Sequence, residues 1–333
     1  MINNKNILIT GGTGSFGRNL TNYLLENHDP NKIIIYSRDE LKQSQMINDL
    51  KGNEKILRFF IGDVRDYSRL KLAMKGVNIV FHAAALKNVP LAEYNPFEAV
   101  KTNILGAQNI IDASLENNVE KVLALSTDKA SSPVNIYGAT KLASDKLFIS
   151  ANNYKGKNKT KFSVVRYGNV MGSRGSVIPV FKKFYNSNYL PITDKRMTRF
   201  NITLLEAVKF VIGSLKIMCG GEIFVPKIPS FKVTDLAKAM FPNKKLKIIG
   251  MRPGEKIHEE MISIGDSINT IEFKNSYIIC PQSDFVIWDK NKHIKNKKGS
   301  KIFIENTSYN SGSNKEFLSV KEIRKILVKN KFI

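Results

Sequence analysis

Two pairs of residues in the stretch LALSTDKASSPVNIYGATKLASDKL (123–147) could do acid–base chemistry. Tyr137 and Lys141 are four residues apart, so on a helix they lie on the same face. A phenol is a poor base at neutral pH, and a neighbouring ammonium lowers its pKa by favouring the phenolate. Asp128 and Lys129 form a second acid–base pair just upstream. Simple redox chemistry needs only the first pair, so the second indicates an additional chemical step.

The position of this stretch supports that interpretation. LALSTDK ends an apolar run that we predict to be a strand, and Thr127 falls at its carboxyl end. Ligands of open parallel sheets bind outside the carboxyl ends of the strands. A Tyr-x-x-x-Lys pair alone occurs often by chance in a lysine-rich chain. Its context favours one catalytic group: Thr127, Asp128, Lys129, Tyr137 and Lys141.

Short apolar runs alternate with amphipathic stretches through the first half of the chain, which predicts βαβ units and a parallel sheet. The expected strands are residues 6–10, 32–37, 56–63, 78–84, 121–127 and 162–168, with helical patterns at 18–27 and 100–118. The second half is less regular. There we expect helices at 203–216, 232–241 and 318–330 and a strand at 221–226. Thr234 and Ser319 are the expected N-caps of the last two helices.

A glycine-rich turn follows the first predicted strand. Gly11, Gly14 and Gly17 have the spacing G-x-x-G-x-x-G, which differs from the common G-x-G-x-x-G fingerprint. Glycines let the backbone approach a pyrophosphate, whose charge then lies at the helix N-terminus. The turn therefore predicts a dinucleotide site, to which Thr13, Ser15 and Phe16 also belong.

The end of the second strand, YSRDELKQ, bears on the choice of dinucleotide. A carboxylate here is typical of NAD binding, and a cation is typical of binding the 2′-phosphate of NADP. Donors outnumber the single acid Asp39, which favours NADP and leaves NAD as the alternative. Arg38 could also be an ordinary surface charge. The predicted contacts in this segment are Ser37, Arg38, Asp39, Glu40, Leu41 and Lys42.

Two further strand ends fit a cofactor. GDVRD places Asp63 and Val64 where they suit contact with an adenine. HAAALK offers small residues, Ala83 among them, beside which a cofactor can pass closely. His82 precedes them within an apolar strand, and we interpret it as a packed core histidine rather than a base.

The chain has 333 residues, enough for one large α/β unit or two modest domains, and a net charge of +23. Its one dense basic cluster, residues 289–301, lacks the aromatic residues that stack on bases, so we predict a solvated loop and no nucleic-acid partner. No signal peptide or membrane span is apparent, which predicts a cytoplasmic protein. Cys219 and Cys280 have no metal-ligand spacing, so no metal site is predicted.

The chain resembles the extended short-chain dehydrogenases/reductases that act on nucleotide sugars. Within them it is most similar to the inverting UDP-N-acetylglucosamine (UDP-GlcNAc) 4,6-dehydratases, which open pseudaminic acid biosynthesis for flagellin glycosylation. The similarity runs from the first strand to about residue 260 and is weaker in YNSGSN and FLSVKEIRK near the end. It rests on TGGTGSFG, YSRDELKQ, GDVRD, HAAALKNVPLAEYNP, KTNILGAQN, STDKA, NIYGATKL, VRYGNVMGSRGSVIP, MTRF, GGEIFVPK and RPGEKIHE.

The resemblance implies a use for both acid–base pairs. Tyr137, assisted by Lys141 and Thr127, would take the C4 hydroxyl proton while hydride passes to NADP+. The resulting ketone acidifies C5, so Lys129 would remove the C5 proton and Asp128 would protonate the departing C6 hydroxyl. Hydride then returns to C6, a proton reaches the other face of C5, and the product is UDP-2-acetamido-2,6-dideoxy-β-L-arabino-hex-4-ulose.

Two positions refine the resemblance. Dehydratases of the dTDP-glucose type carry Asp-Glu where this chain has Asp128-Lys129, and the lysine fits the amino-sugar, C5-inverting group. A related set for capsule sugars has methionine in place of Tyr137. For the cofactor the resemblance adds Lys87 and Val170. For the UDP-GlcNAc substrate it implies Lys87, Asn169, Ser173, Arg174, Thr193, Arg252, Glu255 and Tyr309.

The guanidinium of Arg252 could bind the diphosphate through two hydrogen bonds. Each implied substrate residue could instead be an ordinary surface or loop residue, an alternative that is most open for Tyr309. We interpret His258 as helix packing and His293 as solvated.

The predicted fold is α/β: a Rossmann-type doubly wound parallel sheet with a smaller C-terminal α/β substrate-binding domain. We expect the NADP-binding domain to comprise 1–168 plus about 200–225, and the nucleotide-sugar domain about 169–199 plus 226–333. The resemblance also implies a homo-oligomer built from dimers, up to a hexamer. Two alternatives stay open: a nucleotide-sugar epimerase on the same fold, and a non-catalytic dinucleotide sensor that binds nucleic acid or protein.

Overall fold

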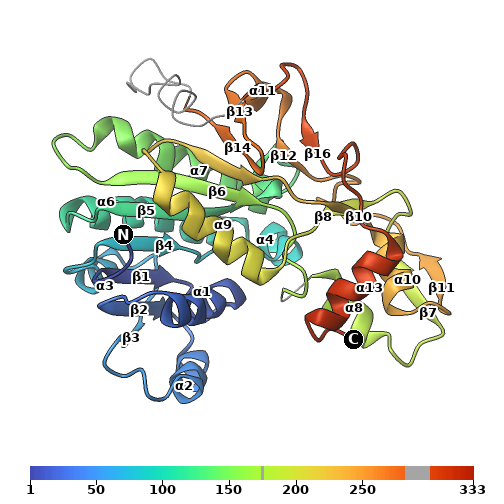
Figure 1. The fold of residues 1–333 in the computed structure, drawn as a ribbon, viewed down its shortest axis with the longest axis horizontal. Coiled ribbons are helices and arrows are strands. Elements are labelled where there is room, and N and C mark those ends of the chain that lie inside the picture. Colours follow the sequence, from blue (N-terminus) through green and yellow to red (C-terminus); the bar gives the residue numbers. More distant parts are fainter. Residues whose placement is uncertain (174–175, 282–300) are drawn as a thin grey trace.

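One large sheet organises the molecule. A computed structural model describes residues 1–173, 176–281 and 301–333, and within them this sheet has ten strands in the order β15-β13-β14-β9-β6-β5-β4-β1-β2-β3 (Figure 1). Neighbours from β3 to β9 are parallel, and β14, β13 and β15 continue the sheet with antiparallel pairing. Its strands are β1 (Asn6–Thr10), β2 (Lys32–Ser37), β3 (Leu57–Ile61), β4 (Ile79–His82), β5 (Lys121–Thr127), β6 (Lys161–Tyr167), β9 (Ile223–Pro226), β13 (Thr270–Glu272), β14 (Ser276–Ile279) and β15 (Lys301–Ile302).

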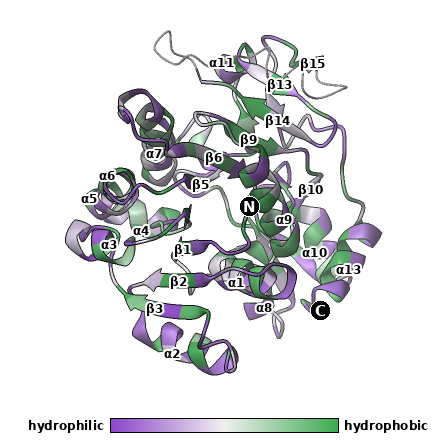
Figure 2. Ribbon diagram, turned by 60° about the vertical axis from the view of Figure 1, so that its left-hand side comes forward, coloured by the Kyte–Doolittle hydropathy of each residue, from purple (hydrophilic) through white to green (hydrophobic). Residues whose placement is uncertain are grey.

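Helices cover both faces of this sheet, as the view in Figure 2 shows. Helices α1 and α9 pack together on one face, and α3, α6 and α7 lie side by side on the other. The central strands are therefore buried on both sides, which explains their continuous apolar sequences. The helices that frame the sheet are α1 (Ser15–Asn27), α2 (Glu40–Asp49), α3 (Tyr67–Ala73), α4 (Val89–Tyr94), α5 (Pro96–Val100), α6 (Gly106–Glu116), α7 (Ile136–Tyr154) and α9 (Leu204–Ile217).

The order of the strands reverses between β1 and β4. Chain order runs outward from β1 to β3 on one side and from β4 to β6 on the other. A crevice forms at such a reversal because the connecting helices leave on opposite faces, and dinucleotides bind there. The doubly wound parallel sheet predicted from the sequence is confirmed.

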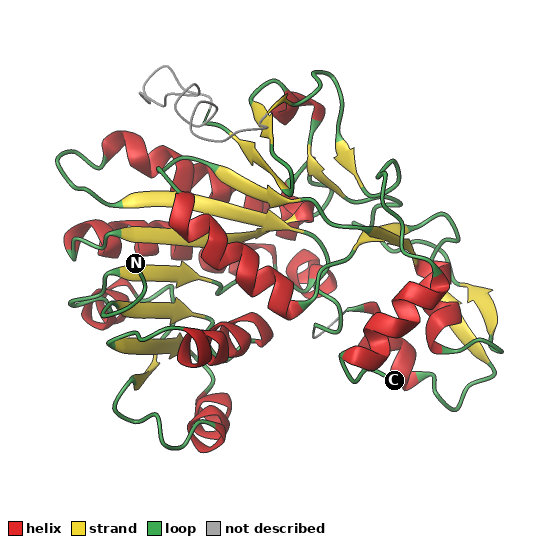
Figure 3. Ribbon diagram, viewed as in Figure 1, coloured by secondary structure: helices red, strands yellow, loops and turns green. Residues whose placement is uncertain are grey.

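A smaller unit with its own apolar core adjoins the carboxyl edge of the sheet (Figure 3). Phe181, Leu190, Leu236, Ile323 and Leu327 are buried in this second core. Its elements are α8 (Val177–Lys183), β7 (Tyr189–Ile192), β10 (Ser230–Lys232), α10 (Val233–Met240), β11 (Lys245–Ile248) and α13 (Val320–Lys329). Further elements are β8 (Thr198–Phe200), β12 (Glu260–Ile262), α11 (Ile264–Ser267) and β16 (Tyr309–Asn310).

The predicted elements are present, with differences at their ends. Ser319 caps α13 through a capping box, as predicted. The prediction for Thr234 was wrong: α10 begins at Val233, its N-cap is Lys232, two residues earlier, and Thr234 lies inside the first turn. The helix expected at 100–118 opens with a π-helical turn, η1 (Lys101–Leu105), before α6.

Strands β13, β14 and β15 lie in the range predicted for the substrate domain, yet they extend the large sheet. The described parts of the chain include no helix with the length and apolar character that crossing a membrane would require.

Candidate active site

A cleft of about 1080 Å³ lies between the large sheet and the smaller unit, and residues of both cores line it. It brings together most of the residues predicted from the sequence. These are Gly11, Thr13, Gly14, Ser15, Phe16, Gly17, Ser37, Arg38, Asp39, Lys42, Asp63, Val64, Ala83, Lys87, Thr127, Asp128, Lys129, Tyr137, Lys141, Asn169, Val170, Ser173, Thr193, Arg252 and Glu255.

Three predicted residues lie elsewhere. Glu40 and Leu41 are exposed on the first turn of α2 and do not line the cleft. Tyr309 is buried in the core, where its hydroxyl donates to the carbonyl of Ile228 (3.0 Å) and accepts from the amide of the same residue (2.9 Å). Both partners are backbone groups away from the cleft, which favours the structural interpretation of Tyr309.

Some predictions fall outside the described residues: Arg174, His293 and the basic cluster 289–301, apart from the backbone of Lys301.

The glycine turn is shaped to leave space at the end of β1. Gly11 has a φ of +64°, which L-residues rarely adopt, and a Cβ there would lie 2.9 Å from the backbone nitrogen of Ala84. A Cβ on Gly17 would lie 2.5 Å from the backbone of Gly12. Only glycine at position 17 therefore lets α1 pack this closely against the turn. This cradle fits the pyrophosphate of a dinucleotide at the N-terminus of α1.

The end of β2 is rich in cations. Asp39 is the N-cap of α2, where it accepts from the amide of Lys42 (2.9 Å) and pairs with the Lys42 ammonium. Arg38 is 60% exposed, and its Nη1 lies 3.4 Å from Oδ2 of Asp63. Asp63 also accepts from Arg65 at 2.7 Å. The carboxylates here are thus engaged by neighbouring cations and amides.

Tyr137 and Lys141 lie in the first two turns of α7, which Asn135 caps by accepting from the amide of Gly138. Both side chains are buried, and the Tyr137 hydroxyl is hydrogen-bonded to Thr127. Burial raises the pKa of Tyr137 to about 12, although Lys129 and Thr127 act to lower it. Burial lowers the pKa of Lys141. Lys129 is thus a cation whose charge favours the phenolate, and the role expected of Lys141 stays a prediction.

Asp128 and Lys129 turn into the cleft on a short 3₁₀ turn, η2 (Asp128–Ala130), directly after β5. Thr127 donates to Asp128 Oδ1 (2.9 Å), and Lys129 Nζ lies 3.0 Å from the same oxygen. Nζ is also 3.1 Å from Oε1 of Glu259, so the ammonium lies between two buried carboxylates. Arg199 Nε lies 3.7 Å from the same Glu259 oxygen.

The three groups shift one another's proton affinities. Burial raises the pKa of Asp128 against the attraction of Lys129. Burial alone would lower the pKa of Lys129, but Asp128 and Glu259 outweigh it and raise that pKa. Burial alone would raise the pKa of Glu259, but Lys129 and Arg199 outweigh it and lower that pKa. Carboxylates with pKa values pushed in opposite directions are suited to different roles in acid–base catalysis.

Several polar atoms in the cleft have no partner among the described residues. An unpartnered buried polar atom is costly, so such atoms mark positions where a ligand or water completes the hydrogen bonds. They are Asp128 Oδ2, Glu259 Oε2, Asn169 Oδ1, Ser176 Oγ and Asn201 Oδ1.

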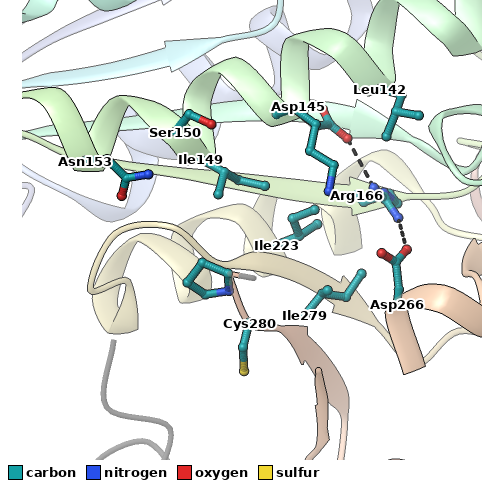
Figure 4. A pocket seen from close by; sticks show the side chains of 12 residues that line it. Leu142, Asp145, Ile149, Ser150, Asn153, Arg166, Ile223, Asp266, Ile279 and Cys280 are labelled. Atoms are coloured by element: carbon teal, nitrogen blue, oxygen red, sulfur yellow. Dashed lines mark hydrogen bonds and ion pairs between the residues drawn. The ribbon is translucent and has the colours of Figure 1, made fainter. Parts of the chain in front are cut away.

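A buried ionic network supports α7 beside a second, small pocket (Figure 4). Arg166 lies between Asp145 and Asp266, at 3.4 and 3.2 Å, beside a small pocket of about 90 Å³. Asp145 also accepts from Ser126 (2.7 Å) and is one helical turn beyond Lys141, whose pKa it raises against the larger effect of burial. The network thus connects the catalytic helix to β6 and α11.

Two histidines have structural environments. His82 is buried, its Nδ1 lies 2.8 Å from Thr10 Oγ1, and burial lowers its pKa to about 3, as a packed core histidine requires. His258 lies in an irregular segment and not on a helix, which corrects our expectation; its Nδ1 is 2.8 Å from Thr198 Oγ1.

The sequence reasoning missed Glu259 and Arg199. Glu259 ends the motif RPGEKIHE and Arg199 lies within MTRF, so both stood in segments that carry the family resemblance. The presence of a charged residue in each of these motifs was the feature of the sequence that could have indicated them.

Comparison with known proteins gives the family of the chain. Residues 7–281 match the model of the family described as polysaccharide biosynthesis protein. The chain belongs to this family. It is 59% identical to the UDP-N-acetylglucosamine 4,6-dehydratase (inverting) of Campylobacter jejuni subsp. jejuni serotype O:2, and the match covers 98% of each chain.

Two further relatives of this chain are informative. The UDP-glucose 4-epimerase of Rickettsia bellii is 42% identical over 98% of this chain and 96% of its own. The solved structure of Pen from Bacillus thuringiensis covers both chains fully, with a TM-score of 0.90 and 37% identity. The same fold thus occurs in relatives named for two different reactions.

Proposed function

We propose that this protein is a nicotinamide-dependent 4,6-dehydratase that converts UDP-GlcNAc with inversion at C5. The observation that carries the proposal is the placement of Asp128 and Lys129 in the same cleft as Tyr137, with Lys129 Nζ 3.0 Å from Asp128. A 4-epimerase needs no acid for a leaving group, so this second pair favours dehydration. The 59% identity to an inverting dehydratase supports the same conclusion.

The cofactor we propose is NADP. The cradle at Gly11 fits a pyrophosphate, and Ser37, Arg38 and Lys42, which line the cleft, would bind a 2′-phosphate. Asp39, the acid that could favour NAD, is engaged in capping α2 and in pairing with Lys42. When bound, the nicotinamide would accept hydride from C4 of the sugar and return it to C6.

In the first step Tyr137 would take the proton of the C4 hydroxyl. The nearby charge of Lys129 favours the phenolate, and the buried Lys141 lies on the same face of α7. The ketone formed at C4 makes the C5 proton acidic enough for a side chain to remove.

In the second step the Asp128–Lys129 pair would eliminate water. Asp128 and Lys129 share one titratable proton. In the resting protein this proton would be on Lys129, and before elimination it would move to Asp128. The Lys129 amine then takes the C5 proton, Asp128 gives its proton to the C6 hydroxyl, the C6–O bond breaks, and a C5–C6 double bond forms. Proton transfer by positioned groups of this kind accelerates reactions by about 10²–10⁴-fold.

We place the UDP-GlcNAc between the two units. All of the following residues line the cleft and would bind it: Lys87, Asn169, Ser173, Thr193, Arg252 and Glu255. This assignment keeps the division into a dinucleotide-binding unit and a sugar-binding unit. The family resemblance also supports a dimer-based homo-oligomer, which light scattering would measure.

Incubation with UDP-GlcNAc and NADP tests the proposal. We expect a product lighter by one water, whose C5 configuration, read from NMR coupling constants, is inverted. Accumulation of NADPH, or retention at C5, would contradict it.

The competing function is 4-epimerisation, which the 42% identity to a protein named UDP-glucose 4-epimerase favours. An epimerase would give a product of unchanged mass with hydrogen retained at C5. Mass spectrometry of the product therefore separates the two functions.

A further inference from the structure

Glu259 contacts the catalytic lysine from outside the motif that carries the chemistry. Its Oε1 lies 3.1 Å from Lys129 Nζ, and its side chain is 3% exposed. Its second oxygen, Oε2, is buried without a partner among the described residues, although Glu259 lines the cleft. A carboxylate held in this way acts on Lys129 at short range and with little screening by water.

The backbone fixes the position of this carboxylate. The amide of Glu259 donates to Oγ of Ser311 (2.9 Å), and its carbonyl accepts from the amide of the same serine (2.7 Å). Ser311 Oγ is in turn 2.8 Å from Thr198 Oγ1. These hydrogen bonds join the backbone at Glu259, just before β12, to Ser311 and, through Ser311, to Thr198 on β8. The backbone of Glu259 is therefore held in place.

Lys129 is in contact with two carboxylates. The acids Asp128 and Glu259 face it at 3.0 and 3.1 Å, and the cation Arg199 lies beyond Glu259. The remaining titratable groups that act on this cluster are Tyr137 and Lys256. With both acids ionised, Asp128, Glu259, Lys129 and Arg199 carry no net charge together, but Lys129 is in direct contact with both carboxylates, which favours a proton on the Asp128–Lys129 pair.

We propose that Glu259 is a positioning residue whose charge keeps the shared proton on the Asp128–Lys129 pair. This inference rests on the proposed dehydration. A pair that had lost this proton would consist of a carboxylate and a neutral amine. It could still remove the C5 proton, but it would have no acid to protonate the leaving C6 hydroxyl, so elimination would stall.

The proposal has a definite pH signature. Removing a nearby negative charge lowers the proton affinity of every neighbouring group, and an opposite charge at this distance changes a pKa by about 1–3. In Glu259→Gln the alkaline decline of kcat should therefore move to lower pH by about one unit or more, while KM for UDP-GlcNAc stays within about twofold. Loss of a merely structural contact would lower kcat without moving the decline.

Two variants serve as comparisons. Glu260→Gln removes the adjacent acid, which accepts from Ser131 and Ser132 and makes no contact with Lys129. The alkaline decline of kcat in Glu260→Gln should coincide with that of the wild type. If ionisation of the substrate contributes to the decline, it will do so equally in both proteins. Glu259→Asp keeps the charge, so its decline should stay within about half a unit of the wild type. A Glu259→Asp decline that moves as far as that of Glu259→Gln would overturn the proposal.

A second measurement does not depend on turnover. The Lys129 ammonium can be titrated by ¹⁵N NMR in lysine-labelled protein, with the signal assigned by its loss in Lys129→Met. We expect its pKa to fall in Glu259→Gln, and an unchanged pKa would refute the inference. If the wild-type protein releases no water from UDP-GlcNAc but the Lys129 pKa still falls, the proposed function fails and the electrostatic role of Glu259 stands.

Discussion

Replacing Lys129 by methionine should destabilise the protein in a pH-dependent manner. The change keeps the length of the side chain but removes the cation between Asp128 and Glu259, which are 1% and 3% exposed. Removing one partner of a buried ion pair costs about 3–5 kcal/mol, because the other charge stays buried and unpaired. Lys129 is 23% exposed, so water can partly replace it, and we expect about 3 kcal/mol.

The sign of the pH dependence follows from the two carboxylates. Without Lys129 both are buried acids with raised pKa values, so the folded state binds protons more tightly than the unfolded state does. The stability lost in Lys129→Met should therefore be greatest at pH 8 and should shrink as the pH falls through the raised pKa values. In the wild-type protein Lys129 attracts both acids and the pKa of Glu259 is lowered, so this recovery should be weaker there.

Thermal unfolding followed by circular dichroism measures both effects. For a chain of this size, about 3 kcal/mol corresponds to a decrease in Tm of about 6 °C at pH 8. The decrease should be clearly smaller at pH 5.5. Lys321→Met, at an exposed position on α13, is the matched control and should change Tm little at either pH. A decrease of the same size at both pH values would refute the reasoning, as would no decrease at all.

Three further predictions follow from the site. Arg38→Ala should weaken binding of NADP by about tenfold or more and binding of NAD far less, measured by fluorescence titration; equal losses would exclude the proposed 2′-phosphate contact. Tyr137→Phe should abolish the transient formation of NADPH in single-turnover absorbance while still binding UDP-GlcNAc, and normal oxidation by this variant would remove the role of the phenol. Arg166→Met should lower the free energy of unfolding by about 3–5 kcal/mol in urea titrations, since it leaves Asp145 buried without its cation. Arg196→Met, which breaks an exposed pair, is the control for that variant, and equal effects of the two would contradict the buried network.

The residues that could be predicted are those whose spacing is local. The glycine turn, the Asp128–Lys129 pair and the Tyr137–Lys141 pair each lie within one strand end or one helix, so the sequence pattern itself places them. Parallel pairing then brings the strand ends to one edge of the sheet. For these residues, knowledge of the fold class was enough to predict the site.

Glu259 and the Asp145–Arg166 network could not be predicted in this way. Glu259 reaches Lys129 only because β12 pairs with β16 and packs beside η2, a contact between segments far apart in the chain. Arg166 lies within FSVVRYG, a predicted buried strand in which an arginine is unexpected. Its partners are Asp145 on α7 and Asp266 on α11, which are far from it in the sequence. Long-range pairing decides both cases, and neither propensity nor spacing encodes it.

The end of β2 shows a further limit. The sequence indicates an excess of cations there. Whether Asp39 serves as the N-cap of α2 depends on the residue at which that helix begins. Helix ends are difficult to predict because several residues can serve as the cap.

The most direct test of the central claim is to incubate the protein with UDP-GlcNAc and NADP in heavy water and to analyse the product by mass spectrometry and NMR. We predict a 4-keto sugar lighter by one water, with deuterium at C5 and no accumulated NADPH. A product of unchanged mass that retains hydrogen at C5 would show that Asp128 and Lys129 do not eliminate water, and it would contradict the claim.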